Sequence, residues 1–542
     1  MTAPFPRTLR PSPLPVGLGA LRRGRGRALL PWLAPVWCLA CGGEDPIEHG
    51  NTDAACRAAP PAPSAFTPMS GPGGPTQSFS EAPASTPCAF LDGGEHDTDH
   101  HNTGFMLDGY LVMPLVPEWG DGVISVFDFS DACAPKALHH ERALAIRETH
   151  ATGVSTHAGR HMVVAHLQGL SFWDMSEVTR PARVADLVLP GVFYPDAYAR
   201  VVMSLFWQAP YVYVAGSDNG LYVVDATDPA NPTLVTQYRF EVPLRAGGIF
   251  AVGNLLVVTA AEGSRVALLD ISDPAAPQPI PGGTFEVTDE AGVPRDVYHS
   301  HVNGDKLLFA RKGGGGGLII YDIKDPSRPT YLGGNSPPHS NGGYVYLKDD
   351  RAFVGDSSFA SVFDIKDPAR VTLEHTFYLQ SVDPPKESPG DLDTLLPIGN
   401  VVIASSDENN RSQEHPSGDV ADRASQVFAM DAAPDTLGPI VTMVNPPDGA
   451  QGVARTSRVG ITLSEFVELG SVFAGSFHVV KQGCQGPLQG HYSGQEGILS
   501  FWPKEPLEAN TTYEVVVPAG GIIDVNGNPT RAAFRASFTT GE

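Results

Sequence analysis

The sequence predicts an all-β protein, and three observations carry this prediction. The 542 residues include 58 glycines and 50 prolines but only 18% charged residues, a composition that favours short strands joined by tight turns. An apolar segment that ends in aspartate recurs through the middle of the chain. The C-terminal part alternates apolar and polar positions in short runs separated by turn residues. These patterns indicate two successive β-domains.

Residues 1–40 have the pattern of a lipoprotein-type signal peptide. They contain six arginines and no acidic residue, and they end in an apolar run from Ala28 to Ala40. A helix of that length covers roughly 20 Å, less than the ~30 Å hydrocarbon core, so the run fits a signal peptide better than a membrane span. The run leads into Cys38-Leu39-Ala40-Cys41, which resembles the lipobox of bacterial lipoproteins. The resemblance implies a lipidated Cys41 and an anchor on the outer membrane or cell surface, and ordinary secretion is the alternative.

Residues 41–89 predict a disordered linker. Proline, alanine, serine and glycine dominate this segment, as in RAAPPAPSAF and MSGPGGPTQ, with almost no apolar periodicity. Such a segment buries too little apolar surface to fold by itself. We therefore expect a tether between the anchor and the folded domains.

An aspartate-capped strand is repeated seven times between residues 90 and 435. The copies include VISVFD, LSFWD, LYVVD and LIIYD, and turns such as DATDPANP follow them. The repeated residues are Asp128, Asp174, Asp225, Asp270, Asp322, Asp364 and Asp431. An aspartate in this place can accept hydrogen bonds from the free N–H groups of the turn, so we expect these carboxylates to be structural and not catalytic.

Each repeat unit is about 45 residues long and holds four short strands, which is the content of one propeller blade. Seven units therefore predict a seven-bladed β-propeller over residues 90–435. The recurring apolar-Asp strand and its Asp-Pro turn resemble the LVIVD repeat family of bacterial extracellular propellers. That resemblance implies a fold and a compartment but no specific chemistry.

Residues 436–542 predict a second β-domain with the strand spacing of a β-sandwich. Strand-like segments such as VGITLSE and TTYEVVVP alternate with turn sequences such as NPPDGAQG and DVNGNP. Their order resembles the bacterial Ig-like domain of surface-layer proteins. The full prediction is an all-β chain in which a seven-bladed propeller is followed by an Ig-like β-sandwich, behind a disordered N-terminal tether.

Four cysteines follow the lipobox-like segment, and their spacing does not match a metal site. In an extracytoplasmic compartment Cys88 could pair with Cys133 or with Cys56, and the sequence does not choose between these pairings. We expect Cys484 to stand alone in the Ig-like domain.

Histidines gather where the innermost strands of several blades are predicted to begin. The candidates are His100, His101, His150, His299, His301 and His339. Innermost strands converge on the central channel, and neutral imidazole binds Cu and Zn, so these side chains form a candidate metal site at one channel mouth. The alternative is that they only hydrogen-bond a neighbouring blade.

Charge excludes one class of partner. The formal net charge is −24 even though the first 40 residues are basic, so the remainder repels nucleic acid. We expect a non-catalytic binding or display protein whose propeller face engages an extracellular protein, glycan or wall ligand, with the membrane reached only through the lipid anchor. The alternative is an extracytoplasmic enzyme that depends on Cu or Zn at the channel histidines.

Overall fold

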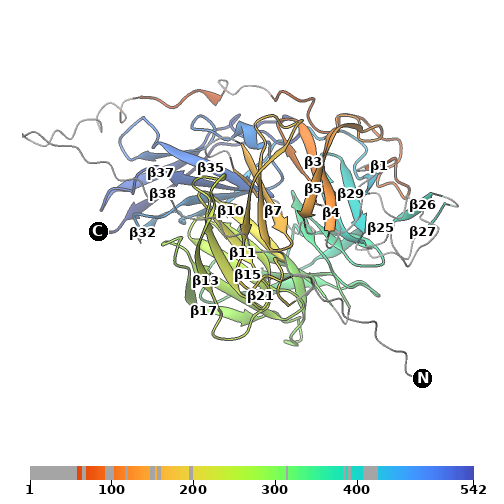
Figure 1. Ribbon diagram of the computed structural model, residues 1–542, viewed down its shortest axis with the longest axis horizontal. Coiled ribbons are helices and arrows are strands. Elements are labelled where there is room, and N and C mark those ends of the chain that lie inside the picture. The colour runs from red at the N-terminus through yellow and green to blue at the C-terminus, as the bar shows by residue number, and fades with distance from the viewer. Residues whose placement is uncertain are drawn as a thin grey trace, which may run out of the picture. The chain divides into compact units, whose positions relative to one another are not determined.

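The computed structural model describes the chain from Cys56 onward, with gaps. The described residues are 56, 58–63, 69–91, 103–115, 120–146, 153–155, 160–193, 199–312, 315–382, 385–387, 392–406 and 425–542. The predicted signal peptide and the predicted lipidation site Cys41 lie outside them. Strands dominate the regular structure (Figure 1), and none of the described segments forms a helix long and apolar enough to cross a membrane.

Seven antiparallel units of four strands form the blades of a β-propeller, as predicted. The first strands of blades 2 to 7 contact one another in succession and therefore line the central channel. The strands of blades 1 to 4 are β2 (Phe105–Leu107), β3 (Tyr110–Leu115), β4 (Gly120–Asp128), β5 (Lys136–Ile146); β6 (Gly153–Ser155), β7 (His161–His166), β8 (Gly169–Asp174), β9 (Ala182–Val188); β10 (Ser204–Gln208), β11 (Tyr211–Ala215), β12 (Leu221–Asp225), β13 (Thr233–Tyr238); β14 (Ala246–Val252), β15 (Leu255–Ala260), β16 (Arg265–Asp270) and β17 (Gln278–Glu286).

The remaining three blades follow the same order, apart from the last strand of blade 7. Their strands are β18 (Val297–Asn303), β19 (Lys306–Arg311), β20 (Leu318–Asp322), β21 (Thr330–Asn335); β22 (Val345–Lys348), β23 (Arg351–Gly355), β24 (Ala360–Asp364), β25 (Thr372–Phe377); and β28 (Leu392–Ile398), β29 (Val401–Ser406), β30 (Ser425–Ala429) with β1 (Ala89–Leu91). A small hairpin of β26 (Gln380–Val382) and β27 (Pro385–Glu387) lies between blades 6 and 7 in the chain.

The N-terminal strand closes the ring. Strand β1 pairs antiparallel with β30, with Phe90 opposite Gln426, and so supplies the outermost strand of blade 7. Next to it, Cys88 forms a disulfide with Cys133 in blade 1, which is one of the two pairings that the sequence left open. Strand pairing and disulfide together connect the last blade to the first.

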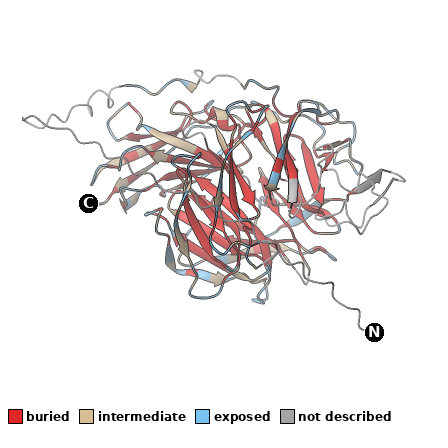
Figure 2. Ribbon diagram, in the orientation of Figure 1, coloured by how far each residue is buried: buried red, intermediate tan, exposed pale blue. Residues whose placement is uncertain are grey.

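The core lies between the blades and follows the strand order within each blade. Strands β11 and β12 of blade 3 are almost wholly buried, whereas the outer strand β9 of blade 2 alternates exposed and half-buried residues (Figure 2). Large side chains such as Trp173, Trp207 and Tyr213 are fully buried. An outer strand has one free edge and one face toward solvent, so an alternating pattern is expected there.

The repeated aspartates hold the turns after the third strands. In the first six blades each of them ends its strand, as Asp225 ends β12. The Asp225 carboxylate accepts hydrogen bonds from the Thr227 N–H at 2.8 Å and from its hydroxyl at 2.7 Å. The seventh member, Asp431, instead accepts both of its bonds from the Arg351 guanidinium, each at 3.0 Å.

The second domain is a sandwich of two sheets. Its elements are β31 (Val441–Asn445), β32 (Ala450–Val453), β33 (Val459–Leu463), a 3-10 turn η4 (Leu469–Ser471), β34 (His478–Lys481), β35 (Gly490–Gln495), β36 (Ile498–Pro503), β37 (Thr512–Val517) and β38 (Phe534–Thr540). One sheet has the order β35-β36-β33-β31 and the other β32-β38-β37-β34. Phe477, Phe501 and Phe538 fill the space between them.

The described part of the predicted linker lies against both domains. Gly74 donates its N–H to the Val525 carbonyl at 2.8 Å, and Phe79 donates to Ala432 at 2.8 Å. These are backbone contacts, which need no apolar periodicity in the linker. The expectation that Cys484 stands alone is wrong, because it forms a disulfide with Cys56 at a sequence separation of 428. Sequence spacing cannot encode a contact over that separation.

Candidate functional site

The propeller channel has two mouths. Because neighbouring strands are antiparallel, the turns between first and second strands all lie at one mouth, and the segments leading into the first strands lie at the other. The first, here called the covered mouth, is formed by the turns Asp108–Gly109, Ala209–Pro210, Gly253–Asn254, Gly304–Asp305, Asp349–Asp350 and Gly399–Asn400. The second, the open mouth, includes the described segments 216–220, 239–245, 261–264, 287–296, 336–343 and 356–359.

The Ig-like domain docks on the covered mouth. Turns from five blades donate backbone N–H groups to it, and β35 extends blade 2 by pairing Ser493 with Ser155 of β6. The donor–acceptor pairs are Asp108 and Gly109 to the Glu468 carboxylate (2.9 and 3.0 Å), Ala209 to Ser493 Oγ (3.0 Å), Asn254 to Asn445 Oδ1 (2.8 Å), Gly304 to Thr462 Oγ1 (3.2 Å) and Asp349 to the Ser464 carbonyl (2.6 Å). One end of the channel is therefore occupied by the protein's own second domain.

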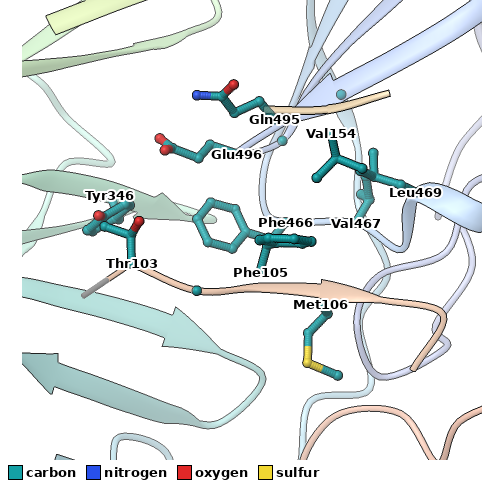
Figure 3. Close-up of a pocket in the computed structure, with 13 residues that line it drawn as sticks. Thr103, Phe105, Met106, Val154, Tyr346, Phe466, Val467, Leu469, Gln495 and Glu496 are labelled. Carbon is teal, nitrogen blue, oxygen red and sulfur yellow. The ribbon is translucent and has the colours of Figure 1, made fainter. Parts of the chain in front are cut away.

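The turn between β35 and β36 lies at this interface, next to His301 of β18 and Tyr346 of β22. Glu496 (φ 50°) and Gly497 (φ 76°) form a two-residue turn with both residues left-handed, as a tight hairpin requires. A cavity of about 40 Å³ remains around the turn, which is room for water. Figure 3 shows Thr103, Tyr346 and Phe466 across this cavity from Glu496.

Burial governs the electrostatics of this cavity. The Glu496 side chain is only 11% exposed, and burial raises its pKa to about 8. Burial lowers the pKa of His301 to about 4, although the Val302 and Glu496 carbonyls at 3.1 and 3.2 Å favour the charged ring. His301 Nε2 lies 3.6 Å from Glu496 Oε2. Near neutral pH the Glu496 carboxyl is therefore protonated and the His301 ring is neutral, so the pair carries no net charge.

Sequence reasoning missed Glu496. The Glu-Gly pair between two strands predicts a solvent-exposed hairpin turn, and nothing local in the sequence indicates that this turn is covered. Its burial depends on the docking of one domain on the other.

The predicted metal-site histidines are spread over the structure. His299 is buried on β18, where its Nδ1 accepts the Val345 N–H at 3.4 Å and its ring packs on Phe250. His339 is exposed in the segment that leads into blade 6. His100, His101 and His150 lie outside the described residues.

Within the described residues, no histidine belongs to a group of three metal-ligand side chains close enough to share an ion. The hypothesis of a Cu or Zn site stays a prediction.

One cluster of carboxylates does form at the covered mouth, from segments far apart in sequence. Asp435, Glu465 and Asp524 place oxygens within 4.8 Å of one another. The Lys348 ammonium donates to Glu465 Oε2 at 2.8 Å and to Asp435. Burial works against the charge on Lys348, but these two carboxylates outweigh it and raise its pKa. The Lys348 ammonium thus supplies the positive charge for this cluster of carboxylates, and it joins blade 6 to the Ig-like domain.

The open mouth carries exposed charge. Arg245 Nε lies 3.1 Å from Asp218 Oδ1, and Lys312 Nζ lies 3.8 Å from Glu262 Oε1 and 4.4 Å from the centre of the Tyr298 ring. Each pair connects neighbouring blades. Such groups are available to a ligand, in contrast to the donors that the Ig-like domain uses at the other mouth.

The open mouth also contains a buried titratable group, Asp356. Asp356 accepts the Gly317 N–H at 2.8 Å, and burial raises its pKa to about 7. This carboxyl holds the second-to-third-strand turns of blades 5 and 6 together.

Comparisons with known proteins agree with the two resemblances seen in the sequence. The bacterial Ig-like domain model matches residues 435–540, and the LVIVD repeat model matches residues 202–239, in blade 3. No match is found among curated proteins.

Solved structures resemble the chain only distantly. They include the computationally designed Ika8 protein (12% identity, 77% of this chain and 99% of that one, TM-score 0.38) and the periplasmic gluconolactonase PpgL of Pseudomonas aeruginosa (12% identity, 49% and 82%, TM-score 0.43). A third is Hsv2p of Kluyveromyces lactis (12% identity, 50% and 76%, TM-score 0.34). The two family models and the arrangement of the strands show that the chain contains an LVIVD repeat within a β-propeller, followed by a bacterial Ig-like domain.

Proposed function

We propose that the protein is a lipid-anchored binding protein of the cell surface, and that it engages a protein, glycan or wall ligand through the open mouth of its propeller. The observation that carries this proposal is the asymmetry of the channel. The Ig-like domain occupies the covered mouth with backbone hydrogen bonds, whereas the open mouth offers charged side chains such as Lys312 and Arg245. Loops on a rigid scaffold are frequent sites of recognition.

Charge reversal at the open mouth tests the binding face. The double variant Lys312→Glu/Arg245→Glu should weaken binding of the purified full-length protein to isolated envelope fragments at least tenfold. The two new carboxylates would repel the anionic groups of the ligand that Lys312 and Arg245 attract. The matched control reverses Lys366 and Arg370, which lie in the turn after β24 on the side of the covered mouth. Unchanged binding by the first variant, or equal loss in the control, would refute the assignment of the open mouth.

The anchor is tested separately. Cys41→Ser should move the protein from the membrane fraction to the soluble fraction and abolish labelling with a radioactive fatty acid. Cys38→Ser is the matched control and should leave both unchanged. A membrane-bound, unlabelled Cys41→Ser protein would contradict the lipid anchor.

A further inference from the structure

A second pocket lies at the junction of the two domains, outside the channel. Its volume is about 330 Å³, within the size range of small-ligand pockets. The side chains that matter here are Tyr211, Asp273, Arg455, Arg458, Trp502 and Lys504. The propeller supplies the first two, from blades 3 and 4, and the Ig-like domain supplies the others.

The cations of this junction pocket are not paired with carboxylates. Arg455, Arg458 and Lys504 make no salt bridge within the described part of the chain, in contrast to cations such as Arg295, which pairs with Asp289 at 2.5 Å. Three unpaired cations in one pocket are notable in a chain with a net charge of −24. With the carboxylates of Asp273 and Glu505 on the same lining, the three cations leave the pocket with an excess of one positive charge.

Among these three cations, Arg458 is the one that is buried. It is only 2% exposed, yet its contacts are a 3.4 Å hydrogen bond from Nε to the Ala209 carbonyl and a cation–π contact with the Tyr211 ring, 5.1 Å from the ring centre. Burial lowers its pKa. A buried guanidinium is normally held by a carboxylate or another anion, so this one lacks its usual partner among the described residues.

The other walls favour a sugar ring over a simple inorganic anion. Tyr211 and Trp502 supply aromatic surface, against which the apolar face of a sugar can pack. The Asp273 carboxylate can accept hydrogen bonds from sugar hydroxyls, and the Tyr211 hydroxyl can donate or accept them. Cations, aromatic rings and hydroxyl partners together match a saccharide that carries carboxylates.

We propose that the junction pocket binds an acidic saccharide, with a carboxylate of the ligand on Arg458, assisted by Arg455 and Lys504. The Arg458 guanidinium offers donors in a fixed plane that suits a carboxylate, and its buried position strengthens the interaction. This site is separate from the open mouth, and it requires both domains because each contributes one wall.

Isothermal titration of the full-length protein with tri-galacturonic acid tests the site. We expect binding with one site per chain, and no binding of the fully methyl-esterified trimer, which keeps the rings and loses the charges. Lys504→Ala should weaken binding about fivefold and Trp502→Ala about threefold, while Arg458→Gln should weaken it more than tenfold. If Arg458→Gln does not fold, the Lys504→Ala and Trp502→Ala variants still test whether the saccharide binds in this pocket.

Matched controls separate this site from its neighbours. Lys481→Ala removes a cation of the Ig-like domain that pairs with Glu508 away from the pocket, and should leave binding unchanged. Lys312→Glu at the open mouth should also leave saccharide binding unchanged. The junction pocket and the binding face at the open mouth are therefore tested independently, and one proposal can fail without the other.

Three results would overturn the proposal. They are absence of binding, equal affinity for inorganic phosphate with no effect of Trp502→Ala, and tighter binding of a hexaglutamate peptide than of the saccharide.

Discussion

The two mouths of the channel are built from the same repeated hairpins but differ in chemistry. At the covered mouth, tight two-residue turns present backbone N–H groups that hydrogen-bond to the Ig-like domain. At the open mouth, ion pairs such as Arg245–Asp218 remain exposed. The repeat therefore determines the ring, whereas the domain that docks on it determines which face is left for a ligand.

The largest expected difference between the mouths concerns their lysines. Lys348→Met leaves the buried carboxylates of Glu465 and Asp435 without their cation, so the free energy of unfolding should fall by about 3–5 kcal/mol. Lys312→Met at the open mouth is the matched control and should cost less than about 1 kcal/mol, because its ion pair is long, at 3.8 Å, and its partner Glu262 is 39% exposed. Urea unfolding at pH 7 measures both, and equal costs would contradict the distinction.

The next effect depends on pH and belongs to the covered mouth. The folded pKa of Glu496, about 8, is above its unfolded value, so its contribution to stability is complete below pH 4.5 and is lost as pH rises toward 8. The folded pKa of His301, about 4, is below its unfolded value, so its contribution is complete above pH 6.5 and is lost as pH falls. The two slopes cancel between about pH 4.5 and 6.5.

Of these two groups, only Glu496 contributes a slope above that window. The contribution of Glu496 to the free energy of unfolding should therefore fall by about 2 kcal/mol between pH 6.5 and 8, and buried carboxyls such as Asp356 add slopes of the same sign. Glu496→Gln should make the fall smaller by this amount, and Glu505→Gln, at the rim of the junction pocket, serves as control. A Glu496→Gln profile identical to that of the wild type would show that this side chain is not protonated in the folded state.

The smallest effect compares two aspartates of blade 3. Asp225→Ala removes the acceptor of the Thr227 N–H and hydroxyl and should cost about 1–2 kcal/mol. Asp218→Ala at the open mouth removes only an exposed ion pair and should cost less than about 0.5 kcal/mol. Thermal unfolding of the two variants in parallel gives the comparison, and the reverse order would refute a structural role for the repeated aspartate.

The fold could be read from the sequence because its determinants are local and repeated. LYVVD followed by DATDPANP contains the buried strand, its terminal aspartate and the turn, and the structure has these features in the predicted place. The Ig-like domain was predictable from the order of its strands and turns for the same reason.

The sites could not be read in this way because they depend on contacts between distant segments. Glu496 and His301 are 195 residues apart, and the partners of Lys348 lie 87 and 117 residues away. Arg458 stands in a short polar stretch that gives no sign of its burial. Sequence reasoning instead selected the histidines, whose chemistry is evident from residue type alone.

The disulfide between Cys56 and Cys484 also directs mechanical force. A pull on the chain before Cys56 passes through the sulfur atoms into the C-terminal domain and bypasses the 427 residues between them, including the short strand Ala89–Leu91 that closes the ring. With the proposed N-terminal anchor, tension from a bound partner would therefore not open the propeller from that end.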